Sequence, residues 1–208
     1  MKKLFFIAMM ACASFGTVQA QKTSGFELGG NAGISFAALT DSDAQNTTDR
    51  ITTFNLAASG EYYFSDRWGL KMKLILDNKG WGNGFITDQF GNTITNTDFN
   101  LTYLTVPVMA NWHFGSTRKW YLNFGLYAGF LLNAEDSATN TDVSDAIQSV
   151  DIGLAAGIGY KFPISEKAFL YVEYEGQAGF GDVFETNLGD TVRTTRDSFN
   201  IGVLFPLD

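Results

Sequence analysis

A long alternation of apolar and polar residues, Thr102–Leu132, most constrains the fold of this chain. The even positions are almost all apolar up to Phe114, a polar break covers Gly115–Lys119, and the apolar even positions then resume at Trp120. A period of two indicates two extended strands joined by a hairpin turn. Each strand is longer than the usual 5–6 residues or so of soluble domains and matches the roughly 9–11 residues of a strand that crosses a bilayer.

Residues 1–20 have the three parts of a secretory signal peptide. Lys2 and Lys3 form the basic start, Leu4–Phe15 is a short apolar core, and Val18–Ala20 has the small-residue pattern of a cleavage site. The apolar core is too short to span a membrane as a helix. The one cysteine, Cys12, lies in this leader, so we expect no disulfide and no cysteine-ligated metal in the exported part, 21–208.

The charge of the exported part argues against nucleic acid as a partner. Removal of Lys2 and Lys3 from the 14 basic residues leaves 12 against 22 acidic residues, a formal charge of −10. A nucleic-acid backbone demands a basic protein surface. No stretch after the leader approaches 18 consecutive apolar residues, the length expected of a transmembrane helix.

The same alternation predicts eight strands after the leader. They cover Gly25–Ala38, Thr52–Phe64, Trp68–Asp77, Thr102–Phe114, Trp120–Leu132, Val150–Phe162, Ala168–Gly181 and Ser198–Phe205. The connections alternate between long and short, as in bacterial outer-membrane barrels with long outer loops and short periplasmic turns. We therefore expect periplasmic termini and four extracellular loops, at Thr40–Arg50, Asn78–Asp98, Asn133–Ser149 and Asp182–Arg196.

Charged residues are restricted to one face of these strands. The apolar face carries none within the eight cores, and the opposite face collects a predicted lumen network of Glu61, Lys71, Lys73, Asp151, Lys161, Glu173 and Glu175. A lysine or arginine facing lipid at the bilayer midplane costs about 2–4 kcal/mol, which explains the exclusion. The pattern predicts an all-β fold: an eight-stranded, antiparallel, up-and-down transmembrane β-barrel that is inside-out, with an apolar exterior and a polar lumen.

Two local features make sharper predictions. If Phe64 and Trp68 close the turn over residues 65–67, then Glu61 lies directly opposite Lys71, where opposite charges can pair. Pro107 lies in mid-strand, where its missing N–H breaks a ladder hydrogen bond, so we expect a local bulge there.

The stretch Tyr103-Leu104-Thr105-Val106-Pro107-Val108, followed by Trp112-His113-Phe114, resembles the PorT-like family of small outer-membrane β-barrels. The glycine-alternating stretch Asp151–Tyr160 is also similar to a strand of that family. The resemblance covers essentially residues 21–208. It implies an eight-stranded barrel with periplasmic termini and implies no active site.

Apart from the barrel pattern, the sequence offers few candidate catalytic, metal-binding or contact residues. His113 is the one histidine, and we expect a hydrogen-bonded lumen residue there, not a catalytic base. The acidic loops, including Asp41–Asp43 and Glu135–Asp136, offer oxygen ligands for calcium, but they lack the spaced ligands of an EF-hand, so solvated charge is the favoured interpretation and we predict no metal site. We also predict no cofactor and no catalytic residue. The loop around Trp81 and Phe85 is predicted to expose large aromatic side chains. It is a candidate contact surface for an unidentified extracellular partner or for lipid, and the alternative is that it rests across the barrel mouth.

These features favour a non-enzymatic outer-membrane protein with a side-chain-plugged lumen and exposed acidic loops, in a structural or surface-interaction role. A narrow transport channel is the alternative, because the inner face of the sixth strand is lined with glycine. A lipid-modifying enzyme and a soluble lipocalin-like binder are further alternatives. The expected partners are the lipid bilayer of a Gram-negative outer membrane and, during biogenesis, the barrel-assembly machinery.

Overall fold

The structure is a computed structural model that describes residues 25–40, 48–87, 93–186 and 189–207 of the 208-residue chain. The leader predicted at 1–20 lies outside these ranges. Among the described residues, no helix has the length and apolar character needed to cross a membrane.

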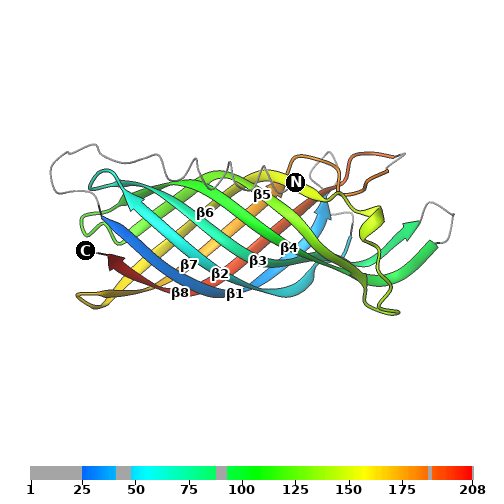
Figure 1. Cartoon of the computed structure of the whole chain (residues 1–208), viewed down its shortest axis with the longest axis horizontal. Helices are drawn as coiled ribbons and strands as arrows, with labels where there is room; N and C mark the ends of the chain where they lie inside the picture. Colours follow the sequence, from blue (N-terminus) through cyan, green and yellow to red (C-terminus); the bar gives the residue numbers. More distant parts are fainter. Residues whose placement is uncertain (1–24, 41–47, 88–92, 187–188, 208) are drawn as a thin grey trace, which may run out of the picture.

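The described ranges form eight strands and one short 3-10 helix, η1 (Ser144–Ala146). The strands are β1 (Phe26–Thr40), β2 (Ile51–Tyr63), β3 (Trp68–Thr87), β4 (Thr93–Phe114), β5 (Trp120–Asp136), β6 (Val150–Ser165), β7 (Ala168–Gly179) and β8 (Arg193–Leu207). Each strand pairs with the next in antiparallel fashion, and β8 pairs with β1 to close the sheet (Figure 1). The predicted eight-stranded, up-and-down, all-β barrel is confirmed.

The strands are staggered around the barrel. A circuit along the cross-strand pairs starts at Phe36 on β1 and returns to β1 at Phe26, ten residues away. It passes through Asp197, Gly176, Ala156, Phe124, Ala110, Leu70 and Tyr62. Such a stagger tilts barrel strands by about 35–45° from the barrel axis, and the tilt is visible in Figure 1.

The turn between β2 and β3 sets the register that the sequence predicts. The Ser65 hydroxyl accepts hydrogen bonds from the backbone N–H groups of Arg67 (3.3 Å) and Trp68 (2.9 Å), which tightens the turn. Glu61 consequently lies opposite Lys71, so the predicted register is confirmed.

The loop predicted over Asn78–Asp98 is wrong, because most of this stretch is strand. β3 continues to Thr87 and β4 begins at Thr93, and the hairpin they form projects beyond the barrel (Figure 1). The pairing shifts register after Trp81, where Asn83 takes a positive φ of 52°. The apolar alternation stops near Asp77, so this polar, glycine-rich extension carries no period-two signal. β8 likewise begins at Arg193, earlier than the apolar pattern indicates.

The prediction of a bulge at Pro107 is also wrong. Pro107 pairs with Tyr127 on β5 without a register shift, and the β3–β4 register is the same on both sides of the proline. The missing N–H therefore removes one hydrogen bond but inserts no extra residue. The irregularity between β4 and β5 lies at Thr102–Tyr103 instead.

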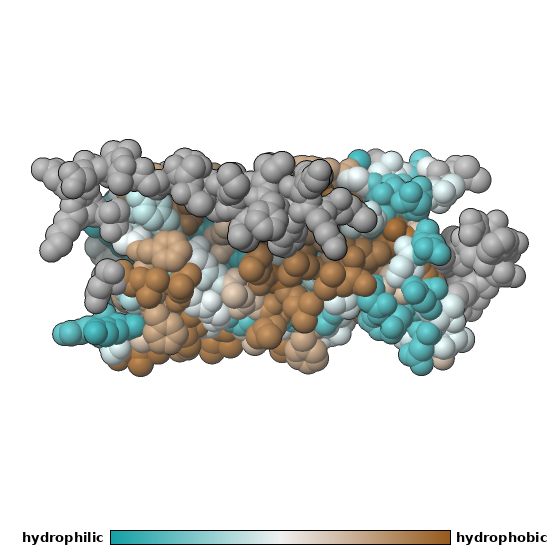
Figure 2. All heavy atoms as spheres, viewed as in Figure 1, coloured by the Kyte–Doolittle hydropathy of each residue, from teal (hydrophilic) through white to brown (hydrophobic). Residues whose placement is uncertain are grey.

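The two faces of the sheet differ sharply in exposure. Large apolar side chains stand on the outside, as in Phe54 (67% exposed) and Leu56 (62%), and Figure 2 shows apolar residues over the middle of the visible face. The alternate positions are buried even where they carry charge, as in Glu61 and Lys71.

Tyrosine rings fill the space beside two inward-facing glycines of β6. Tyr121 lies opposite Gly159, and Tyr127 lies opposite Gly153. A Cβ atom at Gly159 would overlap the Tyr121 ring. One at Gly153 would overlap the Ala178 carbonyl oxygen and lie 2.7 Å from Cε1 of Tyr127. Glycine on β6 therefore makes room for aromatic side chains of β5.

We expect Gly159→Ala to lower the free energy of unfolding by about 1–3 kcal/mol, the usual cost of overpacking. The Tyr121 side chain is fully buried, and the ammonium groups of Lys71 and Lys161 lie 4.8 and 5.6 Å from the centroid of its ring, so the ring cannot shift without disturbing them. Urea unfolding of the detergent-folded barrel measures the loss, and Tyr121→Leu in the same chain should reduce it.

Gly60→Ala is the matched control. Its Cβ would meet Cζ of Phe26 at 3.3 Å on the exposed face, where the ring can shift. Equal losses at Gly159 and Gly60 would contradict the fit of Tyr121 against Gly159.

Candidate functional site

Four strands bring six of the seven predicted lumen residues into one buried cluster. β2 supplies Glu61, β3 supplies Lys71 and Lys73, β6 supplies Lys161, and β7 supplies Glu173 and Glu175. Their odd-numbered positions share the inner face of the sheet, and all six side chains are buried. Ion pairs connect all six into one continuous chain.

Acidic and basic groups alternate along this chain, which we call the lumen charge chain. In order it comprises Glu27, Lys161, Glu61, Lys71, Glu173, Lys73, Glu175, Arg196 and Asp77. Every member between the two ends contacts two groups of opposite sign. Because an unpaired buried charge is costly, this alternation is what permits so many charges inside the barrel.

Glu173 is the centre of the lumen charge chain. One carboxylate oxygen accepts from Lys71 Nζ and from Asn123 Nδ2, each at 2.7 Å. The other oxygen accepts from Lys73, whose ammonium also contacts Glu175 Oε2 at 2.5 Å. Glu173 on β7 thus ties β3 and β5 together across the lumen.

The predicted pair of Glu61 with Lys71 is present but is the longest link of the chain. Lys71 Nζ lies 3.6 Å from Glu61 Oε1 and only 2.7 Å from Glu173 Oε2. Glu61 makes its closer contacts with Lys161 and with Asn111 Nδ2 (2.5 Å). The contacts that Lys71 and Glu61 make across the lumen are therefore shorter than the contact between these two directly opposed residues.

Asp151, the seventh predicted residue, lies apart from the other six. It pairs with Lys79 (2.9 Å) and accepts hydrogen bonds from Tyr127 OH (3.0 Å) and Thr194 Oγ1 (2.8 Å). The Lys79 ammonium also lies 4.5 Å from the centroid of the Tyr127 ring, a cation–π contact.

Four charged members of these networks were not predicted from the sequence: Glu27, Asp77, Lys79 and Arg196. Glu27 and Asp77 share the odd-numbered inward face with the predicted residues, which is a signal that could have found them. Lys79 and Arg196 fall in stretches assigned to loops, so their facing could not be predicted. Both lie on strands in the structure, within β3 and β8.

His113 is a hydrogen-bonded lumen residue, as predicted. Its Nδ1 donates to the backbone carbonyl of Arg118 (3.0 Å), and its Nε2 accepts from Asn111 Nδ2 (3.0 Å). Both ring nitrogens are therefore engaged. Among the described residues, no serine or threonine hydroxyl bonds to this ring.

The predicted exposure of Trp81 is wrong. Its side chain is 1% exposed, stacks on Phe99 at 5.0 Å between ring centroids and contacts Phe184 edge-on at 5.8 Å. It belongs to an apolar cluster at the end with the long connections: Leu39, Trp81, Phe99, Leu101, Tyr103, Ala134, Val143, Ile147 and Val183. Burial against these residues removes Trp81 from water. Phe85 pairs with Thr95 through its backbone, and its side chain lies outside the described part.

Asp136 organises the connection that follows β5. Its carboxylate accepts hydrogen bonds from the hydroxyls of Thr139 and Thr97 and from the backbone N–H groups of Ala138 and Thr139. These bonds, with the Thr139 hydroxyl foremost, hold the pKa of Asp136 below its usual range. A depressed carboxyl pKa contributes stability above the unfolded value of about 4 that is lost as pH falls through the folded value. The connection is therefore most stable with Asp136 ionised.

The family model for the outer membrane protein beta-barrel domain matches residues 19–185. This chain belongs to that family. The match covers most of the barrel, and the closed eight-stranded sheet agrees with it. The protein is therefore an outer-membrane β-barrel protein.

Three solved outer-membrane proteins are similar in structure. Neisserial surface protein A is 18% identical, with 86% of this chain and 96% of that chain covered and a TM-score of 0.49. OprG from Pseudomonas aeruginosa is 13% identical, with 89% and 96% covered and a TM-score of 0.48. Ail of Yersinia pestis, solved with the heparin analogue sucrose octasulfate, is 16% identical, with 87% and 99% covered and a TM-score of 0.45. No curated protein matches the chain.

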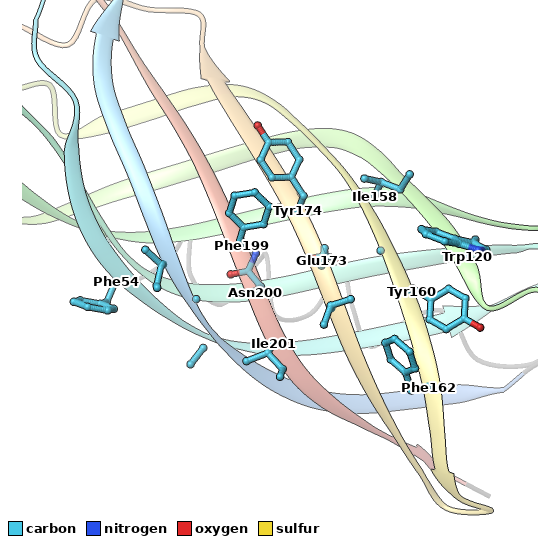
Figure 3. Close-up of a pocket in the computed structure, with 15 residues that line it drawn as sticks. Phe54, Trp120, Ile158, Tyr160, Phe162, Glu173, Tyr174, Phe199, Asn200 and Ile201 are labelled. Atoms are coloured by element: carbon cyan, nitrogen blue, oxygen red, sulfur yellow. The ribbon is translucent and has the colours of Figure 1, made fainter.

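The outside of this outer-membrane barrel carries an apolar hollow (Figure 3). Phe54, Tyr174 and Phe199 are among the side chains that stand around it. Its two polar neighbours, Glu173 and Asn200, are buried and hydrogen-bond inside the barrel. The hollow belongs to the apolar outer face, so the candidate site of this family member is the lumen. Within the described ranges, no group of three or more His, Cys, Asp or Glu residues is arranged to hold a metal ion.

Glu173→Gln should destabilise this barrel strongly, by about 3–5 kcal/mol, because it leaves Lys71 and Lys73 buried with one carboxylate fewer.

Double-mutant cycles should also give a larger coupling energy for Lys71 with Glu173 than for Lys71 with Glu61, because the first pair is 0.9 Å closer. Urea unfolding of the detergent-folded protein measures both quantities.

Asp66→Asn provides the control, since it breaks only the exposed pair of Asp66 with Arg118 (2.8 Å). Its cost should stay below about 1 kcal/mol. A stronger coupling of Lys71 to Glu61 than to Glu173 would refute the cross-lumen ranking.

Proposed function

We propose that this protein is a non-enzymatic, integral outer-membrane barrel whose lumen is plugged by its own side chains. Its role is structural or surface-interacting, and its acidic long connections face the cell exterior. The apolar outer face is the lipid-contacting surface, the leader at 1–20 directs export, and the termini are periplasmic. The narrower resemblance to PorT-like barrels is part of the same proposal.

Exposure supports the lipid-facing assignment. The large exposed side chains of the strands are overwhelmingly apolar, and the described lysines of β3 and β6 are buried. Water would favour the opposite arrangement, whereas hydrocarbon excludes charge from the outer face. Aromatic rings gather at the short-turn end, where Trp68 stacks on Trp112 at 6.1 Å and Phe114 stacks on Trp120 at 6.3 Å. Such belts suit a membrane interface.

The lumen charge chain is the observation that carries the plugged-lumen proposal. Its links cross the lumen from β2 to β6 and from β3 to β7, so they occupy the space that a pore would need. An eight-stranded barrel is only just wide enough for its side chains to fill. The glycine-lined face of β6, which favoured a transport channel, is occupied by Tyr121 and Tyr127 at two of its glycines.

Planar-bilayer recording tests the proposal. The intact protein should insert without reproducible open steps, because its buried ion pairs must break before ions can pass. Glu173→Ala combined with Lys71→Ala and Lys73→Ala removes the centre of the charge chain and should produce measurable conductance. Steady open steps from the unaltered protein would favour the transport channel instead.

Orientation is tested by epitope insertion. A tag beside Asn140, in the exposed connection after β5, should be detected on intact cells. The same tag at Ser116, in the exposed turn between β4 and β5, should be detected only after permeabilisation. The reverse labelling pattern would invert the topology. A lipid-modifying activity lost in His113→Ala would overturn the non-enzymatic part of the proposal.

A further inference from the structure

The short-turn end of the barrel contains a small polar cavity that the lumen charge chain does not fill. Its volume is about 340 Å³, at the small end of the range of ligand pockets. Glu27 and Lys161 lie deep in it, Tyr63 and Phe169 line its walls, and Arg118 and Lys119 lie toward the solvent. The cavity thus combines aromatic walls with charges of both signs.

The deep end of the cavity is already saturated with internal hydrogen bonds. The Lys161 ammonium donates to Glu27 Oε2 (2.7 Å), Glu61 and Tyr63, which accounts for its three protons. The Lys161 side chain is only 6% exposed. This cation therefore shapes the cavity but offers no donor to a ligand.

The outer end of the cavity differs, because its cations retain free donors. Arg118 Nη1 contacts Asp66 Oδ2 at 2.8 Å, and both side chains are about half exposed. An arginine has five N–H donors, so this single contact leaves others available. Lys119 has no side-chain ion pair among the described residues, and its backbone carbonyl accepts from the Lys161 N–H at 2.9 Å. That bond holds Lys119 next to the cavity.

The backbone of Arg118 is held in an uncommon conformation. Its φ of 55° lies in the left-handed region, which a non-glycine residue adopts at a cost of order 1–3 kcal/mol. The Arg118 carbonyl accepts the hydrogen bond from His113 Nδ1 (3.0 Å), which fixes this geometry from inside the barrel. His113 is thereby a positioning residue for the outer end of the cavity.

We propose that this cavity binds a small molecule bearing a carboxylate group, of the size of one or two amino acids. Arg118 and Lys119 hold the carboxylate, and the Tyr63 and Phe169 rings contact the body of the ligand. Lys161 is neutralised by Glu27 and Glu61, and Arg118 faces Asp66, so Lys119 is the cation of the lining that has no carboxylate partner among the described residues, and the cavity favours an anionic group. A planar guanidinium suits a carboxylate particularly well. This proposal goes beyond the plugged-barrel function and does not depend on whether the lumen conducts.

Calorimetric titration of the detergent-folded full-length barrel tests it. Alanyl-alanine should bind, and its C-terminal amide, which lacks the carboxylate, should not. Lys119→Gln should weaken binding of alanyl-alanine by about tenfold, the loss expected for one charge-assisted hydrogen bond.

Arg118→Gly should abolish binding without unfolding the barrel, because glycine adopts the left-handed conformation freely. Lys167→Gln is the matched control, since Lys167 is an exposed cation of the neighbouring β6–β7 turn and does not line the cavity. It should leave the affinity unchanged. Equal affinity for the amide, an equal loss in the Lys167 variant, or no binding of alanyl-alanine at millimolar concentration would each overturn the proposal.

A longer peptide ending in alanyl-alanine separates two sources of the carboxylate. Affinity equal to that of the dipeptide assigns the cavity to a free small molecule, as proposed. Markedly tighter binding of the longer peptide would overturn that assignment in favour of a polypeptide C-terminus.

Discussion

The structure depends on the mutual neutralisation of charges inside the barrel. Glu173 lies between Lys71 and Lys73, and each of these lysines contacts a second carboxylate. Removing any one of these groups from water would be costly, and only the alternation of signs offsets that cost. The lumen charge chain also ties together strands that are not neighbours in the sheet, β3 with β7 and β2 with β6.

Aromatic side chains pack inside the barrel alongside the ion pairs. Inward glycines of β6 receive the rings of Tyr121 and Tyr127, and the Tyr127 ring in turn contacts the Lys79 ammonium. A small barrel has little room to spare, so a residue without a side chain on one strand lets a large one fill the space from the next. The charged side chains of the lumen are themselves buried, and burial strengthens the electrostatic attraction within each ion pair.

The two ends of the barrel are built on different chemistry. The end with the long connections closes over an apolar cluster around Trp81 and Phe99, and Asp136 orders the adjoining connection through hydrogen bonds. The short-turn end keeps a polar cavity with the cations Arg118 and Lys119 near solvent. This barrel thus has an apolar cluster at one end and a small cavity lined by cations at the other.

The sequence by itself determined the number of strands, their facing and the turn that places Glu61 opposite Lys71, because a period of two and a tight turn are local properties of the chain. Only the tertiary structure decided that Lys71 contacts Glu173 more closely, since that pair depends on the stagger that brings β3 and β7 across one lumen. It also decided that Trp81 is buried, because the residues that cover it come from distant connections. The polar extension of β3 and β4 could not be predicted for a related reason. Beyond the apolar belt these strands show no alternation, and only their pairing with each other identifies them as strands.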